Sequence, residues 1–209
     1  MGPFRDVVTT LDELRALLGE PSEVAQKKQV DRLDEHCREF IARSPFVLIA
    51  TADAAGGCDV SPKGDPAGFV LVLDERHLVI PDRPGSRRLD GMRDILANPR
   101  VGLLFLVPGR GETLRVNGRA SIVRDAEVLA RLAVEGKTPR LAIGVEVEEV
   151  FLHCAKAFKR SNLWRPEAWP DISTLPSAAC MLLAHARPDG MTLEQMEQRL
   201  RHSYDTTLY

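Results

Sequence analysis

The spacing of hydrophobic residues changes at Pro45. Before it, apolar residues recur every three to four positions, which is the spacing of one helix face. A first helix is expected after Thr9 or Thr10, either of which can cap it, and a second from Ser22 to about Ala42. The second is interpreted as a packing element without chemistry of its own.

After Pro45 the apolar residues form short runs rich in β-branched side chains and separated by turn residues, a pattern typical of strands. The first strand is expected to begin at Phe46. Further strands are expected in GFVLVLD (68–74), RHLVIPD (76–82), RVGLLFLVP (100–108), TLRVNGRASIVRD (113–125) and LAIGVEVEEVFLH (141–153). The runs on either side of residues 109–111 predict a hairpin.

Helical spacing returns in three later stretches. One is expected to begin at Ser86 and to stop before Pro99, with an inner face of Leu89, Met92 and Ile95 or Leu96. A short one follows residue 125, and an amphipathic one covers residues 191–204.

Six or so antiparallel strands with peripheral helices indicate a small closed or split β-barrel of the α+β class. Residues 1–209 are expected to form a single domain. In it, the helices of residues 1–44 pack on the barrel and residues 170–209 form a helical extension.

Composition narrows the classes of function. The 209 residues are 44% hydrophobic, enough for one sizeable core, and the formal net charge of −2 argues against a nucleic-acid partner. Four well-separated cysteines indicate reduced thiols rather than a zinc site. No stretch resembles a signal peptide or a membrane span, so a cytoplasmic protein without a membrane partner is expected.

The expected helix start at Ser86 carries candidate chemistry. Arg87 and Arg88 would fall in its first turn, where the macrodipole is already positive and each cation costs roughly a few tenths of a kcal/mol. A bound phosphate would explain them, because it would meet a hydroxyl, backbone amides and guanidinium groups together. The alternative is two surface arginines that pair with Asp82 or Asp90, and the spacing alone does not decide.

Two other basic groups are candidates. Lys63 follows a strand-like run and precedes Gly64, which permits close backbone approach, although a lone lysine is more often a surface residue. Lys156, Arg160 and Trp164 follow the last strand and could meet a planar anion by charge and stacking, or could simply be a basic segment anchored by a tryptophan.

Other kinds of site find little support. The chain lacks a dinucleotide-binding glycine motif, a Walker loop, a zinc-protease motif and a hydrolase elbow. His153 and Cys154 are adjacent, but neighbouring side chains of a strand point to opposite faces, so no metal or thiol–base site is expected there. No residue is singled out as a general acid or base.

Residues from about Phe40 to Trp169 resemble the pyridoxamine 5′-phosphate oxidase-like family of flavin-binding split barrels. The resemblance is carried by IPDRPGSRRLDGMRDILANPRVGLLFLVPGRGETLRVNGRA, together with SPKGD and HCAKAFKRSNLWRPEAWP. The first of these stretches is similar to the family's strand, Ser-Arg-Lys phosphate motif, helix, Asn-Pro and following hairpin, in the same order. An uncharacterised branch of the family is the nearest match.

The resemblance implies FMN as cofactor. Ser86, Arg87 and Arg88 would stand at the FMN phosphate, with Arg88 in place of a lysine. The isoalloxazine ring would be lined by Val60, Ser61, Lys63, Pro81 and Asp82. Asp82 departs from the family pattern, and an acidic residue near the ring edge would disfavour an anionic reduced flavin.

The family also implies a homodimer with FMN at its interface, and Lys156, Arg160 and Trp164 would complete the pocket, from the same or the second subunit. The residues by which the true oxidase holds its vitamin substrate are not found, so the resemblance implies the cofactor rather than the reaction. Two functions remain open: an FMN-dependent oxidoreductase of unknown substrate, with Ser61 and Lys63 as donors to the ring, or a non-catalytic protein that stores or senses flavin or haem.

Overall fold

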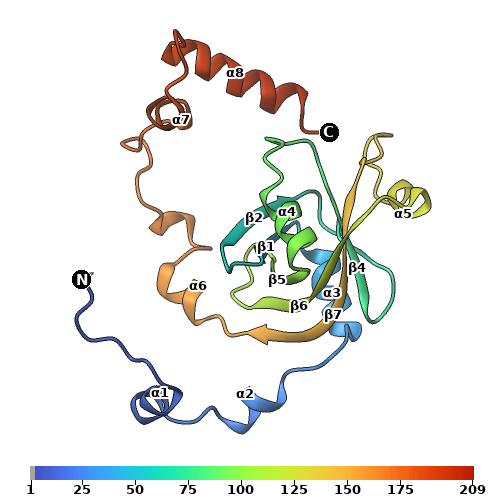
Figure 1. Ribbon diagram of the computed structural model, residues 1–209, viewed down its shortest axis with the longest axis vertical. Coiled ribbons are helices and arrows are strands. Elements are labelled where there is room, and N and C mark those ends of the chain that lie inside the picture. Colours follow the sequence, from blue (N-terminus) through green and yellow to red (C-terminus); the bar gives the residue numbers. More distant parts are fainter. Residues whose placement is uncertain (1–2) are drawn as a thin grey trace.

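Seven antiparallel strands form one curled sheet in the computed structural model, which describes residues 3–209 (Figure 1). The strands are β1 (Phe46–Ala52), β2 (Cys58–Gly64), β3 (Leu71–Val72), β4 (His77–Pro81), β5 (Arg100–Leu106), β6 (Thr113–Val123) and β7 (Ala142–His153). Their order is β2-β1-β5-β6-β7-β4-β3, so β2 and β3 are the sheet edges. The chain is therefore an α+β protein with an antiparallel split β-barrel and peripheral helices.

The barrel interior is filled by every second residue of the strands, because side chains alternate between the two faces of a sheet. Val47 and Ile49 of β1 face inward, and so do Leu103 and Phe105 of β5. The helix α3 (Glu35–Arg43) closes this core with Cys37, Phe40 and Ile41.

Six helices are capped by a Ser, Thr or Asp side chain, which satisfies backbone N–H groups that have no partner inside the helix. They are α1 (Leu11–Leu18, cap Thr10), α2 (Glu23–Lys27, Ser22), α3 (Asp34), α5 (Ala126–Ala130, Asp125), α7 (Ala178–Ala186, Ser177) and α8 (Leu193–Thr206, Thr192). In the described part of the chain, no side chain caps α4 (Asp90–Ala97) or α6 (Lys156–Ser161). A short 3-10 helix, η1, covers Pro166–Ala168.

Several expected boundaries are confirmed. The first strand begins at Phe46, Thr10 caps the first helix, and β5 and β6 form the predicted hairpin. The helix before Pro99 ends at Ala97, as expected, and α8 covers most of the amphipathic stretch near the carboxyl end.

Two expected elements are wrong in extent. The single helix from Ser22 to Ala42 is two helices, because Val30 pairs as a β-bridge with Val150 and Asp34 then starts a new helix. The strand expected over 68–74 shrinks to the two residues of β3.

The helices outside the barrel differ in how they are packed. Of the helices in residues 3–44, α3 contributes to the core, whereas α1 and α2 have no buried residue. The segment from α6 to α8 curves away from the barrel and returns to it near the loop before α4 (Figure 1). Among residues 3–209, none of the helices has both the length and the apolar character needed to cross a bilayer.

Candidate functional site

One face of β2 carries a row of polar side chains. Asp59, Ser61 and Lys63 alternate with more exposed residues, so all three point to the same side of the strand. Asp65 follows one position beyond the strand, and its side chain is only 1% exposed. This polar row faces the segment that follows β4.

Two ion pairs join β2 to the segment that follows β4. Lys63 donates to Asp82 at 3.2 Å, and Arg83 Nε donates to Asp65 at 2.6 Å. The structure thus brings together Lys63 and Asp82, both predicted for the isoalloxazine site. Arg83 and Asp65 were not predicted, although both lie next to the predicted residues.

The helix α4 does not begin at Ser86, and that prediction is wrong. It begins at Asp90, with Leu89 at the N-cap position and no side-chain cap. Arg87 and Leu89 have left-handed backbone conformations, with φ of 59° and 64°, which prevents helical geometry before Asp90. Ser86 instead accepts a long hydrogen bond, 3.4 Å, from the amide of Arg88.

The two arginines therefore lie in the loop before the helix and not in its first turn. Leu89, expected on the inner face, is 52% exposed, whereas Ile95 is buried. Arg88 Nε donates to Asp90 at 2.7 Å, and this hydrogen bond raises the pKa of Arg88. The alternative of a surface ion pair with Asp90 is thus realised for Arg88.

The start of α4 is seated against β1 and β2. Asp94, one turn into the helix, accepts a buried hydrogen bond of 2.7 Å from Thr51 of β1. A Cβ added to Gly91 would lie 3.5 Å from Thr51 Oγ1 and 3.9 Å from Ser61 Oγ. The predicted phosphate loop and the polar row of β2 are therefore neighbours.

Acidic side chains crowd the same place. Desolvation, with Asp94 and Asp90 nearby, raises the pKa of Asp59, while Arg88 opposes this shift. Carboxylates in this position oppose a second anion, so a phosphate at the start of α4 needs the arginines as well as the backbone amides.

The third predicted group lies elsewhere on the barrel. Lys156 and Arg160 belong to α6, and Trp164 follows it, donating through Nε1 to the carbonyl oxygen of Arg110 at 2.7 Å. Trp164 also stacks on Phe158, with ring centroids 5.5 Å apart. Within residues 3–209, no hydrogen bond or ion pair joins this group to residues 60–90.

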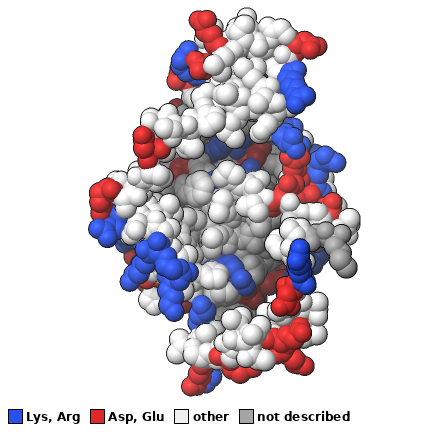
Figure 2. All heavy atoms as spheres, turned by 90° about the vertical axis from the view of Figure 1, so that its left-hand side faces the viewer, with Lys and Arg blue, Asp and Glu red and all other residues white. Residues whose placement is uncertain are grey.

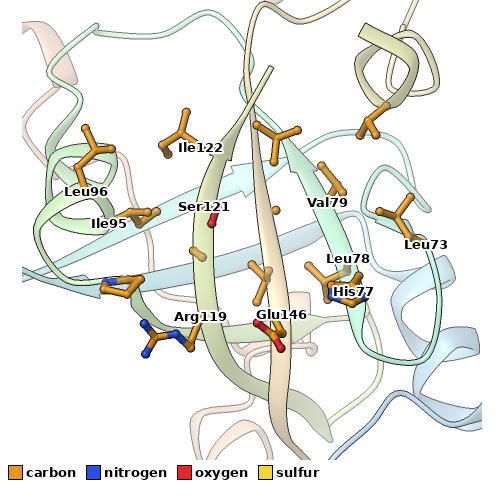
Figure 3. A pocket seen from close by; sticks show the side chains of 16 residues that line it. Leu73, His77, Leu78, Val79, Ile95, Leu96, Arg119, Ser121, Ile122 and Glu146 are labelled. Atoms are coloured by element: carbon orange, nitrogen blue, oxygen red, sulfur yellow. The ribbon is translucent and has the colours of Figure 1, made fainter. Parts of the chain in front are cut away.

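Two surface grooves lie away from the predicted residues. One, of about 680 Å³, is floored by β4, β6 and β7 between α4 and α5, with Arg119 and Glu146 at the end away from Ile122 (Figure 3). The other, of about 630 Å³, is lined by residues of β1, β5, β6 and β7. None of the predicted site residues lines either groove.

The remaining candidates stay isolated. Burial, with Arg115 and Lys28 nearby, lowers the pKa of His153, and Cys154 is an exposed free thiol. Burial raises the pKa of the Cys37 thiol to about 12. In the part of the chain that the structure describes, no group of three or more His, Cys, Asp or Glu side chains is arranged to hold a metal ion.

The family described as pyridoxamine 5′-phosphate oxidase matches residues 33–154. This range covers α3, all seven strands and α4, and so includes the polar row of β2 and the loop before α4. No curated protein matches the chain.

Several solved structures are similar to part of the chain. HupZ from Group A Streptococcus is 18% identical, with a TM-score of 0.46 over 57% of this chain and 92% of that one. A putative pyridoxamine 5′-phosphate oxidase from Lactobacillus delbrueckii is 24% identical, with a TM-score of 0.44 over 58% and 99%. HutZ, a haem storage protein from Vibrio cholerae, is 18% identical, with a TM-score of 0.42 over 58% and 94%.

Proposed function

Because the chain belongs to the pyridoxamine 5′-phosphate oxidase family, we propose that it is a flavoprotein that binds FMN between β2 and the loop before α4. The phosphate is expected at the start of α4. The isoalloxazine ring is expected along the side chains of Ser61 and Lys63 and the backbone of Val60, whose side chain points to the other face of β2, with Pro81 and Asp82 beside it. The proposed activity is an FMN-dependent oxidation or reduction of a small molecule.

The uncapped start of α4 carries this proposal. The first amides of α4, from Asp90 onward, lack the side-chain acceptor that six other helices have. Their partial positive charge adds to the helix dipole, so an anion with several acceptor oxygens fits this end of the helix. The left-handed residues Arg87 and Leu89 are strained, and such strain is often retained where a ligand needs the geometry.

The charged side chains around this point fit a phosphate. Arg87 is exposed and has no acidic partner among residues 3–209, so its guanidinium is free to donate. Arg88 is paired with Asp90 but its side chain is 76% exposed, and such a pair contributes at most about 1 kcal/mol. A phosphate can therefore recruit Arg88 at small cost.

The pair of Lys63 and Asp82 fits the ring edge. FMN supplies the two-electron chemistry when it is bound, while the protein orients it and sets the charge around it. The negative charge of Asp82 would oppose an anionic reduced ring, but Lys63 offsets it at 3.2 Å. The Ser61 hydroxyl lies two residues earlier on the same face of β2, and we expect it to donate to a ring acceptor.

The cofactor is expected at an interface between two copies of the chain. Lys156 and Arg160 lie on α6, and within residues 3–209 no hydrogen bond or ion pair joins them to the loop before α4. A pocket that uses both groups therefore needs α6 from a second copy. This supports a homodimer in which each FMN contacts both subunits.

The direct test is cofactor uptake by the purified protein, with FMN and riboflavin compared because they differ only in the phosphate. We expect a yellow protein that releases FMN and binds FMN at least about a hundredfold more tightly than riboflavin, as two charge-assisted hydrogen bonds would give. Bleaching by a nicotinamide donor and recovery in air would support the oxidoreductase. Equal affinity for the two flavins, or uptake of haem in place of FMN, would contradict the proposal.

A further inference from the structure

The segment from α6 onward, residues 156–209, is called the C-terminal arm here, and it is fastened to its own barrel at two points. Near its beginning, Trp164 donates to the carbonyl oxygen of Arg110 at 2.7 Å. Near its end, the Tyr209 hydroxyl donates to Asp65 at 2.6 Å, which raises the pKa of Tyr209. Between these points the arm stands away from the barrel (Figure 1).

The middle of the arm holds a helix that is apolar on every side. From Ser177 to Ala186, α7 and its cap contain no Asp, Glu, Lys or Arg and a single histidine, His185, yet only Ala179 is buried. Met181 and Leu182 are 50% and 42% exposed. A helix that is apolar all round is normally buried, so packing on α8 alone leaves α7 without a sufficient partner.

A second helix without a partner lies at the other end of the molecule. α1 is amphipathic and has a complete capping box, but none of its residues is buried. Leu17 and Leu18 are 70% and 80% exposed. An isolated helix of this length is marginal in water, so its leucine face also calls for a packing surface.

The outer sides of β1 and β2 offer exposed apolar residues to these helices. On the outer sides of β1 and β2, Ala50 is exposed and Val60 is 64% exposed. The groove of about 630 Å³ on this sheet is lined by small residues such as Ala52 and Gly102 at one side and by charged residues, Arg100, Glu148 and Glu149, elsewhere. Figure 2 shows a molecular face that is hollowed and mostly uncharged at its centre, with the C-terminal arm projecting above it and the N-terminal helices below.

The solvent-accessible surface area of the chain is large enough for a partner to cover part of it. The chain exposes 14805 Å². A folded monomer of 23.1 kDa exposes about 9,700 Å². The surplus, about 5,000 Å², exceeds the roughly 1,000–2,500 Å² that each subunit of an obligate homodimer buries.

We infer that the C-terminal arm and α1 bind a second copy of this chain and hold it as a clasp. The second copy covers the hollowed face shown in Figure 2. In this dimer, α7 of each copy packs on the outer face of the partner's barrel. α1 packs on the partner at the side of this face away from the C-terminal arm. In a twofold-symmetric dimer the same surface of both copies forms the interface. The exposed apolar residues of α7 in one copy can therefore pack on the barrel of the other, and the reverse. The inference rests on the homodimer proposed above and identifies the segments that hold it together.

The test begins with the full-length chain in light scattering or sedimentation over a range of concentrations. We expect a species of twice the chain mass. Met181→Asp and Leu182→Asp, each made separately, should weaken self-association at least about tenfold, because each buries a charge in place of apolar surface. Gln198→Asp, an exposed polar position on α8, is the matched control and should leave the dimer unchanged.

Thiol labelling gives a readout that needs no substitution. Cys180 lies in α7 and is exposed in the single chain, as are Cys58 and Cys154, so the labelled peptide is identified by mass spectrometry. In the dimer it should react with a maleimide at least about tenfold more slowly than in a denatured sample, and dilution into the monomer range should restore the rate. The Leu182→Asp variant should label quickly at every concentration, which also distinguishes a loosened arm from an unfolded protein when its circular dichroism is intact.

The outcomes distinguish the proposed role of the C-terminal arm from the proposed binding of FMN. A dimer that tolerates both substitutions and labels Cys180 quickly would overturn the clasp and leave the proposed dimer and cofactor standing. A monomer at every concentration would overturn the clasp and the dimer, whether or not it binds FMN. A dimer that depends on α7 and binds no flavin would support the clasp and refute the proposed function.

Discussion

α3 and α4 are helices of similar length on the same barrel, and their first turns are built in different ways. α3 begins after Asp34, whose carboxylate accepts the Cys37 amide at 2.8 Å, and this bond lowers the pKa of Asp34. α4 begins after Leu89, an apolar residue in a left-handed conformation that offers no acceptor. The first arrangement satisfies the helix end within the chain, whereas the second leaves it for a ligand.

The largest effect is expected from the arginines before α4. Arg87→Ala combined with Arg88→Ala should weaken FMN binding at least about a hundredfold, because two charge-assisted hydrogen bonds to the phosphate are lost. Riboflavin affinity should hardly change. Titration by flavin fluorescence measures both.

The matched control replaces Arg124 and Arg131 with alanine. Arg124 lies just before α5 and Arg131 just after it, and both are exposed. This double variant should bind FMN like the unaltered protein. If the two double variants lose equal affinity, general surface charge, and not the start of α4, attracts the cofactor.

The capped helix should respond to loss of its own acceptor. Asp34→Ala should lower the free energy of unfolding by about 1–2 kcal/mol at neutral pH. Because the pKa of Asp34 is lowered in the folded protein, its contribution is present above the unfolded pKa and is lost as the pH falls through the folded value. Urea unfolding at neutral and acidic pH measures this, and Glu39→Ala on the same helix should cost only a few tenths of a kcal/mol.

The uncapped helix should gain stability when its strain is relieved. Leu89→Gly should raise the free energy of unfolding of the flavin-free protein by about 1 kcal/mol, because glycine adopts a positive φ without steric cost. The same change at Leu96, an exposed residue in the last turn of α4, should have the opposite sign. Destabilisation by both would mean that Leu89 is not strained.

The smallest effect is expected from the acidic residues near α4. Asp59→Asn should stabilise the protein slightly at neutral pH. The folded pKa of Asp59 is raised, so the native protein loses stability relative to the variant as the pH rises above the ordinary carboxyl value. The difference should vanish in acid, and FMN affinity should rise a few-fold at low salt because one repelling charge is removed. A variant that is less stable at neutral pH would show that Asp59 is held as a favourable charge.

The sequence was sufficient wherever local chemistry decides the structure. Thr10 caps a helix, and Phe46 starts the first strand where the apolar period changes. It failed where distant parts of the chain decide. Val30 is drawn into a bridge with Val150, which breaks the helix expected to continue past it.

The candidate site shows the same division. The order of the motif around residues 80–99 indicates the loop and the family. No residue type there predicts a left-handed backbone at Arg87 and Leu89, and for this reason the prediction of Ser86 as the cap is wrong. The pairing of Asp65 with Arg83 and Tyr209 joins three separate segments, and no sequence pattern signals it.

Amide chemical shifts test most directly whether the start of α4 holds the cofactor phosphate. In a nitrogen-15 spectrum recorded with FMN and then with riboflavin, the amides of Asp90, Gly91 and Met92 should move downfield with FMN and stay nearly unshifted with riboflavin, since only FMN brings acceptor oxygens to them. Equal shifts with both flavins, or FMN-specific shifts confined to other amides, would contradict the account.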